Sequence, residues 1–421
     1  MRNLTVLAFG RAILWASGQQ RQCRVSNIES AKGLALLVAT NSSRVYRVRT
    51  LLRRSAECLA LCLLLLMLGN TALLAQQISL LSQKLTTPTD GDGAPGDNFG
   101  NSIAVSGNTA LIGAYGDTIV AGGTPFGISQ GSAYVFLRDG DQWIRIQKLT
   151  PEPIGMDGDN FGVGVALQND IAAIGAPRRS PNEVFEAGSV FIYARTQQGF
   201  VLVQTLNGAG TEQRFGTSLA LWQDQLLVGS PRAGAGRVDV YQRDAGGQYQ
   251  FQRSLSPSGL LDGARFGAAV AVVDGELLIG APFANNKGAV YRSRFSAGAW
   301  SNAMPLLLIA QRGAELGSAI AIDSGVALLG APGLLGGEVR VLHLIQSEWQ
   351  QVGLLTQTSA ASGNRFGESL AIDPQRAVVG AAATNFSEGA AAVFSRSGTQ
   401  FSPFYTLSLH DALPISEERR V

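Results

Sequence analysis

Few residues in this 421-residue chain could carry out acid–base or metal chemistry. It has only two histidines, His343 and His410, so a Ser-His-Asp set or a histidine metal centre would have to be built around one of them. His343 lies in an apolar run, where a lone histidine is typical of packing. We therefore expect no catalytic residues and no enzyme activity. Paired acids brought together from distant segments, as in a carboxylate-only glycosidase, leave no trace in a sequence.

Clustered acids are the other candidates for chemistry. Asp90, Asp92 and Asp97 lie close together, as do Asp157 and Asp159, with glycine between the paired acids. Alternating Asp and Gly is commoner in tight turns than in metal sites, whereas calcium needs six to eight oxygen ligands. We expect turns, no metal and no cofactor. Calcium at Asp90, Asp92 and Asp97 is the weaker alternative.

The elements that would position such residues repeat six times. A Phe-Gly or Leu-Gly pair is followed, thirteen residues from glycine to glycine, by a Gly-Ala-Pro-like triplet. The pairs are Phe99-Gly100, Phe161-Gly162, Phe215-Gly216, Phe266-Gly267, Leu316-Gly317 and Phe366-Gly367, and the triplets begin at Gly113, Gly175, Gly229, Gly280, Gly330 and Gly380. Repeats of about fifty residues are typical of propellers and arrays, because one unit cannot bury its own apolar face.

Each repeat predicts four short strands. The thirteen-residue interval holds a hairpin, a third strand begins at a glycine such as Gly131, and a more polar fourth strand follows, as at 143–150. The aromatic residue of the motif can insert between blades, its glycine permits close backbone approach, and proline ends the second strand. The sequence predicts an all-β protein, a β-propeller of four-stranded blades.

The motifs resemble FG-GAP repeats, as found in the propeller of integrin α subunits and in many exported bacterial proteins. The resemblance covers about residues 78–408 and departs from the family pattern at Tyr115, Ser230, Leu316 and Ala382. It implies a propeller, usually of seven blades. In the integrin-type repeat, calcium occupies an Asp-rich loop inside the first hairpin. The corresponding turns here are short and poor in acids, so that calcium function does not carry over.

A seventh blade is expected from the start of the repeat region. Residues 83–86, Gln-Lys-Leu-Thr, repeat the fourth-strand sequence of residues 147–150. This strand comes before any first strand, while all six full units have a fourth strand of their own. We expect it to close a seventh blade whose other strands lie beyond the C-terminus.

The two ends of the chain differ from the repeats. Arg53 and Arg54 precede an apolar run and small residues ending at Ala75. This order predicts a signal peptide over 51–75 rather than an uncleaved anchor, because the run is too short to span a bilayer. We expect 1–50 to be a doubtful N-terminal extension or a long signal n-region, 76–408 to be the propeller, and 409–421 to be a non-native or disordered tail rather than a short natural one.

Charge and cysteine content bear on which classes of partner the protein could bind and on where it is located. Residues 1–75 hold ten Lys or Arg and two acids, leaving 23 basic and 29 acidic residues in the remainder. A mildly acidic body without a Lys/Arg cluster predicts no nucleic-acid partner. All three cysteines precede the repeats. After signal cleavage we expect no stable membrane span, and a secreted, periplasmic or cell-surface location.

Loop lengths point to a candidate binding surface. The interval from the triplet glycine to the third-strand glycine is 18 and 13 residues in the first two repeats, and seven to nine in the others. Exposed Phe126, Arg178, Arg179 and Phe185 on these loops would suit a protein or glycan partner, although tolerated insertion explains the lengths equally well. We expect an exported, non-catalytic, adhesion-like binding protein. The alternatives are a hydrolase or lyase acting on polysaccharide and a structural module of a larger adhesin.

Overall fold

The computed structural model describes residues 13–14, 21–22, 85, 96–121, 124–125, 129–153, 156–308, 311–357, 363–383 and 389–408. The chain forms two units, Met1–Lys84 and Leu85–Val421. In the first, β1 (Ile13–Leu14) pairs antiparallel with β2 (Arg21–Gln22). The predictions for the signal segment, the C-terminal tail and most of the N-terminal extension, and those for Asp90, Asp92 and Phe126, fall outside the described residues. In the described part of the chain, no helix has the length and apolarity to span a membrane.

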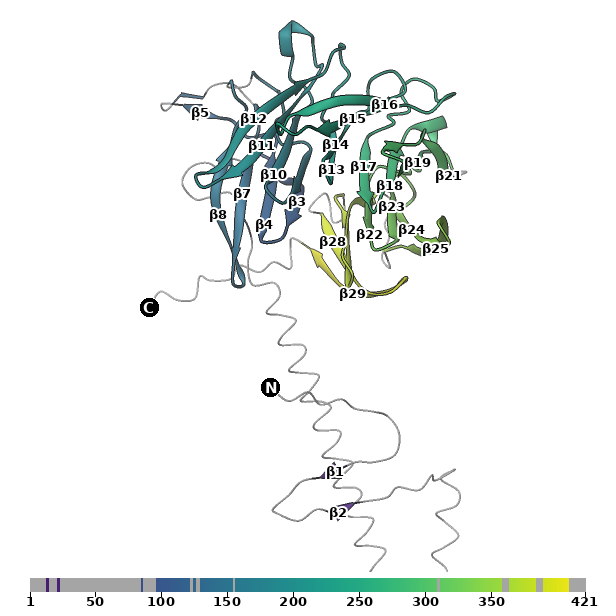
Figure 1. Cartoon of the computed structure of the whole chain (residues 1–421). Coiled ribbons are helices and arrows are strands. Elements are labelled where there is room, and N and C mark those ends of the chain that lie inside the picture. Colours follow the sequence, from purple (N-terminus) through teal and green to yellow (C-terminus); the bar gives the residue numbers. More distant parts are fainter. Residues whose placement is uncertain are drawn as a thin grey trace, which may run out of the picture. The chain divides into compact units, whose positions relative to one another are not determined.

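Six antiparallel sheets follow one another along the described part of the second unit and fan out around a common axis (Figure 1). Blade 1 contains β3 (Phe99–Ser106), β4 (Thr109–Ala114), β7 (Ser132–Asp139) and β8 (Gln142–Leu149), and blade 2 contains β9 (Val165–Gln168), β10 (Ile171–Ala176), β11 (Ser189–Thr196) and β12 (Gly199–Asn207). Blade 3 contains β13 (Ser218–Trp222), β14 (Gln225–Ser230), β15 (Arg237–Arg243) and β16 (Tyr249–Leu255). These blades confirm the predicted all-β propeller.

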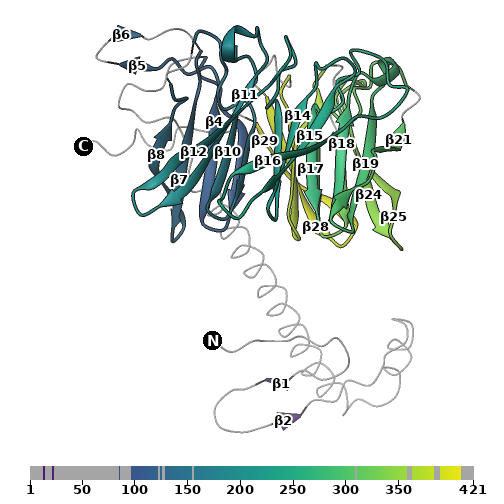
Figure 2. The same ribbon diagram turned by 45° about the horizontal axis from the view of Figure 1, so that its top comes forward.

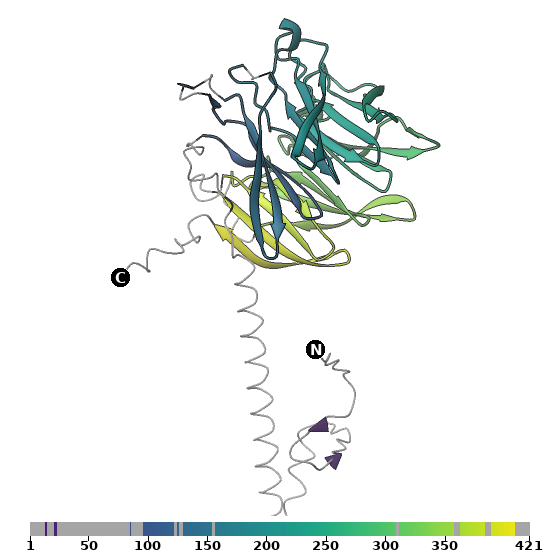
Figure 3. The same ribbon diagram turned by 60° about the vertical axis from the view of Figure 1, so that its left-hand side comes forward.

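The last three blades follow the same order. Blade 4 contains β17 (Ala269–Val273), β18 (Glu276–Ala281) and β19 (Ala289–Ser296), whose outer partner is divided into β20 (Ala299–Trp300) and β21 (Met304–Leu308). Blade 5 contains β22 (Ile320–Asp323), β23 (Val326–Ala331), β24 (Glu338–Ile345) and β25 (Glu348–Leu355). Blade 6 contains β26 (Phe366–Ile372), β27 (Arg376–Ala381), β28 (Ala390–Ser397) and β29 (Gln400–Ser408), which Figure 3 shows beside blade 5.

Loops of different kinds occupy the two ends of the strands. The second strands end just before the motif prolines, as predicted, and the connections to the third strands lie at one end together with the segments that precede the first strands. The short pair β5 (Val120–Ala121) and β6 (Thr124–Pro125) and the 3-10 turns η2 (Pro181–Glu183) and η3 (Ala284–Asn286) belong to these connections. The hairpin turns lie at the opposite end (Figure 2).

Each motif apolar residue from blade 2 onward packs between neighbouring blades, as predicted. Phe161 of blade 2 is buried with Leu111 and Val135 of blade 1 and with Phe191 of its own blade. Burial of one such side chain contributes about 1.5–3 kcal/mol. The corresponding residues of later blades are buried in clusters shared with the preceding blade: Phe215, Phe266, Leu316 and Phe366. One apolar wedge at each interface therefore holds the blades together.

The motif glycines bring the backbones of neighbouring blades into contact. A Cβ built on Gly175 of blade 2 would lie 1.9 Å from the carbonyl oxygen of Gly216 in blade 3, and Gly216 itself has a φ of +92°. The equivalent clash, at 2.1 Å or less, occurs between Gly113 and Gly162, Gly229 and Gly267, Gly280 and Gly317, and Gly330 and Gly367. A side chain at either position would push the blades apart, which explains why both glycines recur at one spacing.

Among the described residues, the contact that joins neighbouring blades is not made between blade 6 and blade 1. A Cβ built on Gly380 would meet only Ser369 of its own blade, and one on Gly100 would meet nothing within 4 Å. Ile103 and Val105 of β3 are 60% and 57% exposed, although their equivalents in the next blade, Val165 and Leu167, pack against the preceding blade.

We call the boundary between blade 6 and blade 1 the seam. Its blade 6 side also exposes an apolar side chain. Val378 of β27 is 37% exposed, whereas its equivalents in the other blades are buried: Leu111, Ala173, Leu227, Leu278 and Leu328. Leu85 packs against the apolar cluster of blade 1 that includes Phe99, as Leu149 packs in the cluster of Phe161. Six blades are thus confirmed, and the described residues do not include the seventh blade that the sequence predicted.

Candidate functional site

The expanded loop of blade 2 is held in place by a buried carboxylate. The Glu186 Oε1 lies 2.8 Å from the Nε of Arg178 on the same loop. Its Oε2 accepts hydrogen bonds from the Nε and Nη2 of Arg214, at 3.0 and 2.8 Å. Burial opposes the ionisation of Glu186, but the hydrogen bonds and charges of Arg214 and Arg178 outweigh it and lower the pKa of this carboxyl. Because Arg214 directly precedes blade 3, this network clamps the loop to the next blade.

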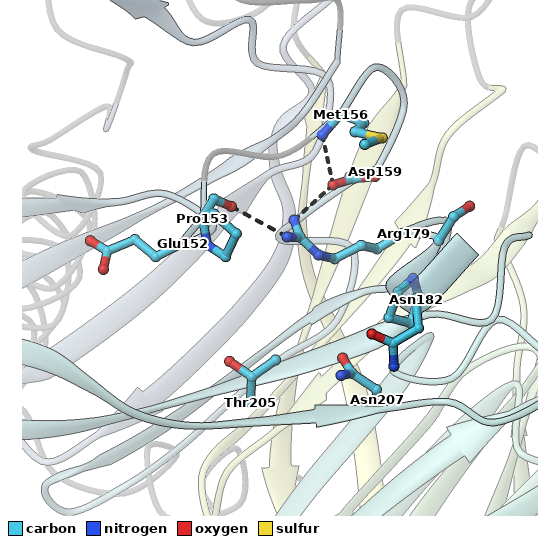
Figure 4. Close-up of a pocket in the computed structure, with 10 residues that line it drawn as sticks. Glu152, Pro153, Met156, Asp159, Arg179, Asn182, Thr205 and Asn207 are labelled. Carbon is cyan, nitrogen blue, oxygen red and sulfur yellow. Dashed lines mark hydrogen bonds and ion pairs between the residues drawn. The ribbon is translucent and has the colours of Figure 1, made fainter. Parts of the chain in front are cut away.

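A second ion pair lies at the base of the same loop (Figure 4). The Arg179 Nη1 donates to Asp159 Oδ2 at 2.9 Å, and its Nη2 donates to the carbonyl of Pro153 at 3.3 Å. The Met156 N–H donates to the same carboxylate oxygen at 3.0 Å. Burial raises the pKa of Asp159, although the bonds from Met156 and Arg179 act in the opposite direction.

The network of Asp159 and Arg179 borders a cavity of about 380 Å³. Its lining comes from three segments: the connection that follows β8, the expanded loop, and the outer strand β12. The lining residues that carry amide, hydroxyl or carboxylate groups include Asn182, Asn207, Thr205, Glu152 and Asp159 (Figure 4). Met156 is 74% exposed at the edge. Such a surface can hydrogen-bond a hydroxyl-rich or amide-rich ligand.

Two of the predicted binding residues lie as expected, and a third does not. Arg178 and Phe185 are exposed on the expanded loop, Phe185 at 57%. Arg179 was expected to be exposed as well, but its side chain is only 16% exposed. The reason is that Asp159 and the ring of Phe191, 5.3 Å from the guanidinium carbon, draw it inward. Arg179 therefore shapes the cavity instead of projecting from the loop.

The weak calcium candidate that can be located gives no metal cluster. Asp97 is buried at the start of blade 1, at the position equivalent to Asp159 in blade 2. Within the described residues, no group of three or more His, Cys, Asp or Glu side chains could hold a metal ion. His343 lies on β24, the third strand of blade 5.

Sequence reasoning missed most of the residues that build the cavity. It interpreted Asp159 as a turn residue and did not single out Glu152, Glu186 or Asn207. The one available signal was the matching position of Asp97 and Asp159 in consecutive repeats. Nothing in the sequence indicates that Glu186 contacts Arg214, because the two come from different blades.

Comparison with known proteins agrees with the architecture. The FG-GAP repeat family matches residues 82–136, 143–193 and 349–394. A solved structure of a candidate 6-phosphogluconolactonase from Bacteroides uniformis is 12% identical, with a TM-score of 0.50 over 71% of this chain and 82% of that one. The periplasmic gluconolactonase of Pseudomonas aeruginosa is also 12% identical, with a TM-score of 0.49 over 73% of this chain and 85% of that one.

Curated proteins of known function include no match to this chain. At 12% identity, the likeness to the Bacteroides uniformis structure shows a shared fold and nothing about activity. The repeats, the six sheets and the glycine contacts between them nevertheless all lead to one family. The chain contains FG-GAP repeats, and its described sheets form a six-bladed β-propeller.

Proposed function

We propose that this chain is a non-catalytic binding module that acts outside the cytoplasm, in the manner of an adhesin, and holds a protein or glycan ligand at the blade 2 cavity. The observation that carries the proposal is the clamped loop: the ion pairs of Glu186 and Asp159 fix its shape before any ligand arrives. A preorganised surface loses less conformational entropy on binding and so gains affinity. The signal-like segment that ends at Ala75 supports the location.

The polar groups in the cavity favour binding over turnover. The Asp159 Oδ2 already accepts hydrogen bonds from Arg179 and from the Met156 N–H. Groups committed to internal bonds orient a loop better than they transfer protons. The amide of Asn182 is exposed and offers donors and an acceptor to a ligand, and the exposed amide of Asn207, whose Oδ1 accepts a hydrogen bond from the Ser189 hydroxyl at 2.8 Å, offers its N–H groups.

The test is a binding screen of the full chain against glycan and peptide arrays, followed by calorimetry on each hit. The variant Asn182→Ala/Asn207→Ala removes two cavity amides, and we expect it to weaken binding roughly tenfold or more. The matched control is Asn169→Ala, an exposed asparagine in the turn between β9 and β10, which should bind as the unaltered protein does. Absence of any ligand, or equal binding by both variants, would overturn the proposal.

A second candidate function is hydrolysis or lysis of a polysaccharide. The observation that favours it is that Glu152 and Asp159 line the same cavity, and that burial raises the pKa of Asp159. Two carboxyl groups in different environments can divide the roles of acid and base. The hydrolase or lyase candidate would replace the binding-only proposal if the protein cleaves a polysaccharide, and if Glu152→Gln and Asp159→Asn each abolish cleavage but still bind the polysaccharide.

We also propose that the intact propeller has a seventh blade, seated between blade 6 and blade 1. The exposed apolar side chains of Ile103, Val105 and Val378 support it, since equivalent residues meet a neighbouring sheet at the other five interfaces. Electron microscopy of the protein purified from its source is the direct test. We expect seven blades in averaged end-on views. A closed ring of six would refute the proposal.

A further inference from the structure

One end of the propeller carries a ring of residues that immediately precede the Phe-Gly or Leu-Gly pairs. In every blade the residue before the Phe-Gly or Leu-Gly pair has a φ between 54° and 60°. These residues are Asn98, Asn160, Arg214, Arg265, Glu315 and Arg365. Side chains other than glycine adopt this conformation infrequently, asparagine most readily. Four of the six are long charged residues, three of them arginine. Strained backbone of this kind concentrates at functional sites.

A second row of residues lies beside this ring. In each blade, the residue after the Gly-Ala-Pro-like triplet donates its N–H to the carbonyl two positions before the Phe-Gly or Leu-Gly pair. In blade 3 this bond joins Arg232 to Gln213 at 3.3 Å, and in blade 4 it joins Phe283 to Ala264 at 3.1 Å. Arg232 is thereby placed next to Arg214, and Phe283 next to Arg265.

Three arginines of these two rows are neutralised by carboxylates. Arg178 and Arg214 share Glu186. Arg365 pairs with Glu315 at 2.9 Å and with Glu368 at 3.1 Å. Ion pairing is therefore the usual state of an arginine on this surface.

Arg232 and Arg265 are the exceptions. Both are exposed, and neither forms an ion pair of 4 Å or less with a carboxylate among the described residues. Asp262 lies against Gly234 in the same region but makes no ion pair with either arginine. The Arg265 guanidinium lies over the ring of Phe283, 4.2 Å from its centroid. Burial, followed by the positive charges of Arg232 and Arg214, lowers the pKa of Arg265, while the negative charge of Glu315 acts in the opposite direction without forming an ion pair with it.

We propose that Arg232 and Arg265 bind the carboxylate groups of an acidic polysaccharide. The inference rests on the proposed binding function and names the ligand class. A guanidinium group presents a planar pair of donors that matches a carboxylate. The guanidinium group of Arg265 lies over the Phe283 ring, which restricts its orientation. Two unneutralised arginines on neighbouring blades repel one another, so an anion placed between them would relieve the repulsion.

The surroundings favour a sugar polymer over an acidic peptide. Arg214 belongs to the same ring as Arg265, and its bonds to Glu186 tie the arginine patch to the clamped loop. Beyond that loop, the amide and hydroxyl groups of the cavity can take the uncharged hydroxyls of neighbouring sugar units. Phe185, exposed on the loop, offers a flat apolar face against which a sugar ring can pack. The patch is open, as suits a chain that runs across a surface.

Calorimetry of the full chain with polygalacturonate fragments tests the inference. Arg232→Gln and Arg265→Gln should each weaken binding roughly tenfold, because each removes a charge-assisted hydrogen bond. Raising the salt concentration should weaken binding of the unaltered protein. The matched control is Arg138→Gln, an arginine at the opposite end of the strands whose side chain is 51% exposed, and it should leave affinity unchanged. Thermal melts establish that each variant is folded.

The outcomes separate this inference from the proposed function. Failure to bind polygalacturonate, unchanged binding in both arginine variants, or tighter binding of polyglutamate than of polygalacturonate would overturn the inference. If polygalacturonate fails to bind while neutral dextran or another uncharged glycan binds and is lost in Asn182→Ala/Asn207→Ala, the proposed function stands and the arginine site is refuted. If no glycan or peptide binds, both fail.

Discussion

Replacing Gly280 by alanine tests the backbone contact that joins blade 4 to blade 5. A Cβ at this position would lie 1.9 Å from the carbonyl oxygen of Gly317, whereas real Cβ atoms essentially never come within 3.0 Å of another heavy atom. The two blades must therefore separate locally by about 1.1 Å. Gly280 does not have a positive φ, so alanine fits its backbone conformation and the substitution isolates the clash.

The expected cost follows from what that separation does to the apolar interface. A gap of about 0.5–1 Å already forfeits a quarter to a half of each dispersion contact, and forced overpacking costs about 1–3 kcal/mol. Because the obstacle is backbone that cannot rotate away, we expect a loss of about 3 kcal/mol in the free energy of unfolding. The matched control is Gly380→Ala, at the same motif position in blade 6, where the added Cβ meets only Ser369.

Urea unfolding followed by tryptophan fluorescence measures the difference. Trp349 is buried at the interface of blades 4 and 5, so its emission reports the opening of this interface. We expect Gly280→Ala to unfold at clearly lower urea than Gly380→Ala, which should stay within about 1 kcal/mol of the unaltered protein because a serine hydroxyl can rotate. Equal destabilisation by the two substitutions would refute the account of the motif as an interblade contact.

Three further predictions concern stability. The pKa of Glu186 is lowered in the folded state. The ionised carboxyl therefore adds to the free energy of unfolding above the unfolded pKa of 4.5, and this stabilisation is lost as the pH falls through the folded pKa. Glu186→Gln should flatten the acid limb of a curve of stability against pH. Burial raises the pKa of Tyr241 from 10 to about 12. The stability that the neutral phenol contributes is therefore complete below pH 10 and is lost towards pH 12. In urea unfolding, the stability of Tyr241→Phe should depend less on alkaline pH than that of the unaltered protein. Ile103→Ser at the open seam should change stability by under about 0.5 kcal/mol, whereas Val165→Ser at the equivalent, partly buried position of blade 2 should cost more than about 1 kcal/mol in thermal melts. Equal costs at these two positions would mean that another sheet covers the seam.

The architecture could be predicted because its determinants are local and repeated. A thirteen-residue interval fixes the register of one hairpin, and six copies of it imply six equivalent sheets. The roles of the aromatic wedge and of the close-packed glycines followed from residue size alone, as Phe161 and Gly175 illustrate. The sequence also located the expanded loop that carries Arg178 and Phe185, because loop length is read directly along the chain.

The composition of the site was decided by tertiary structure. Arg179 pairs with Asp159 twenty residues earlier, and Glu186 pairs with Arg214 of the next blade. Arg232 and Arg265 become a patch only because two blades stand side by side. Electrostatic pairing depends on distances of a few ångströms between side chains from separate repeats, and a sequence orders residues along the chain without giving those distances.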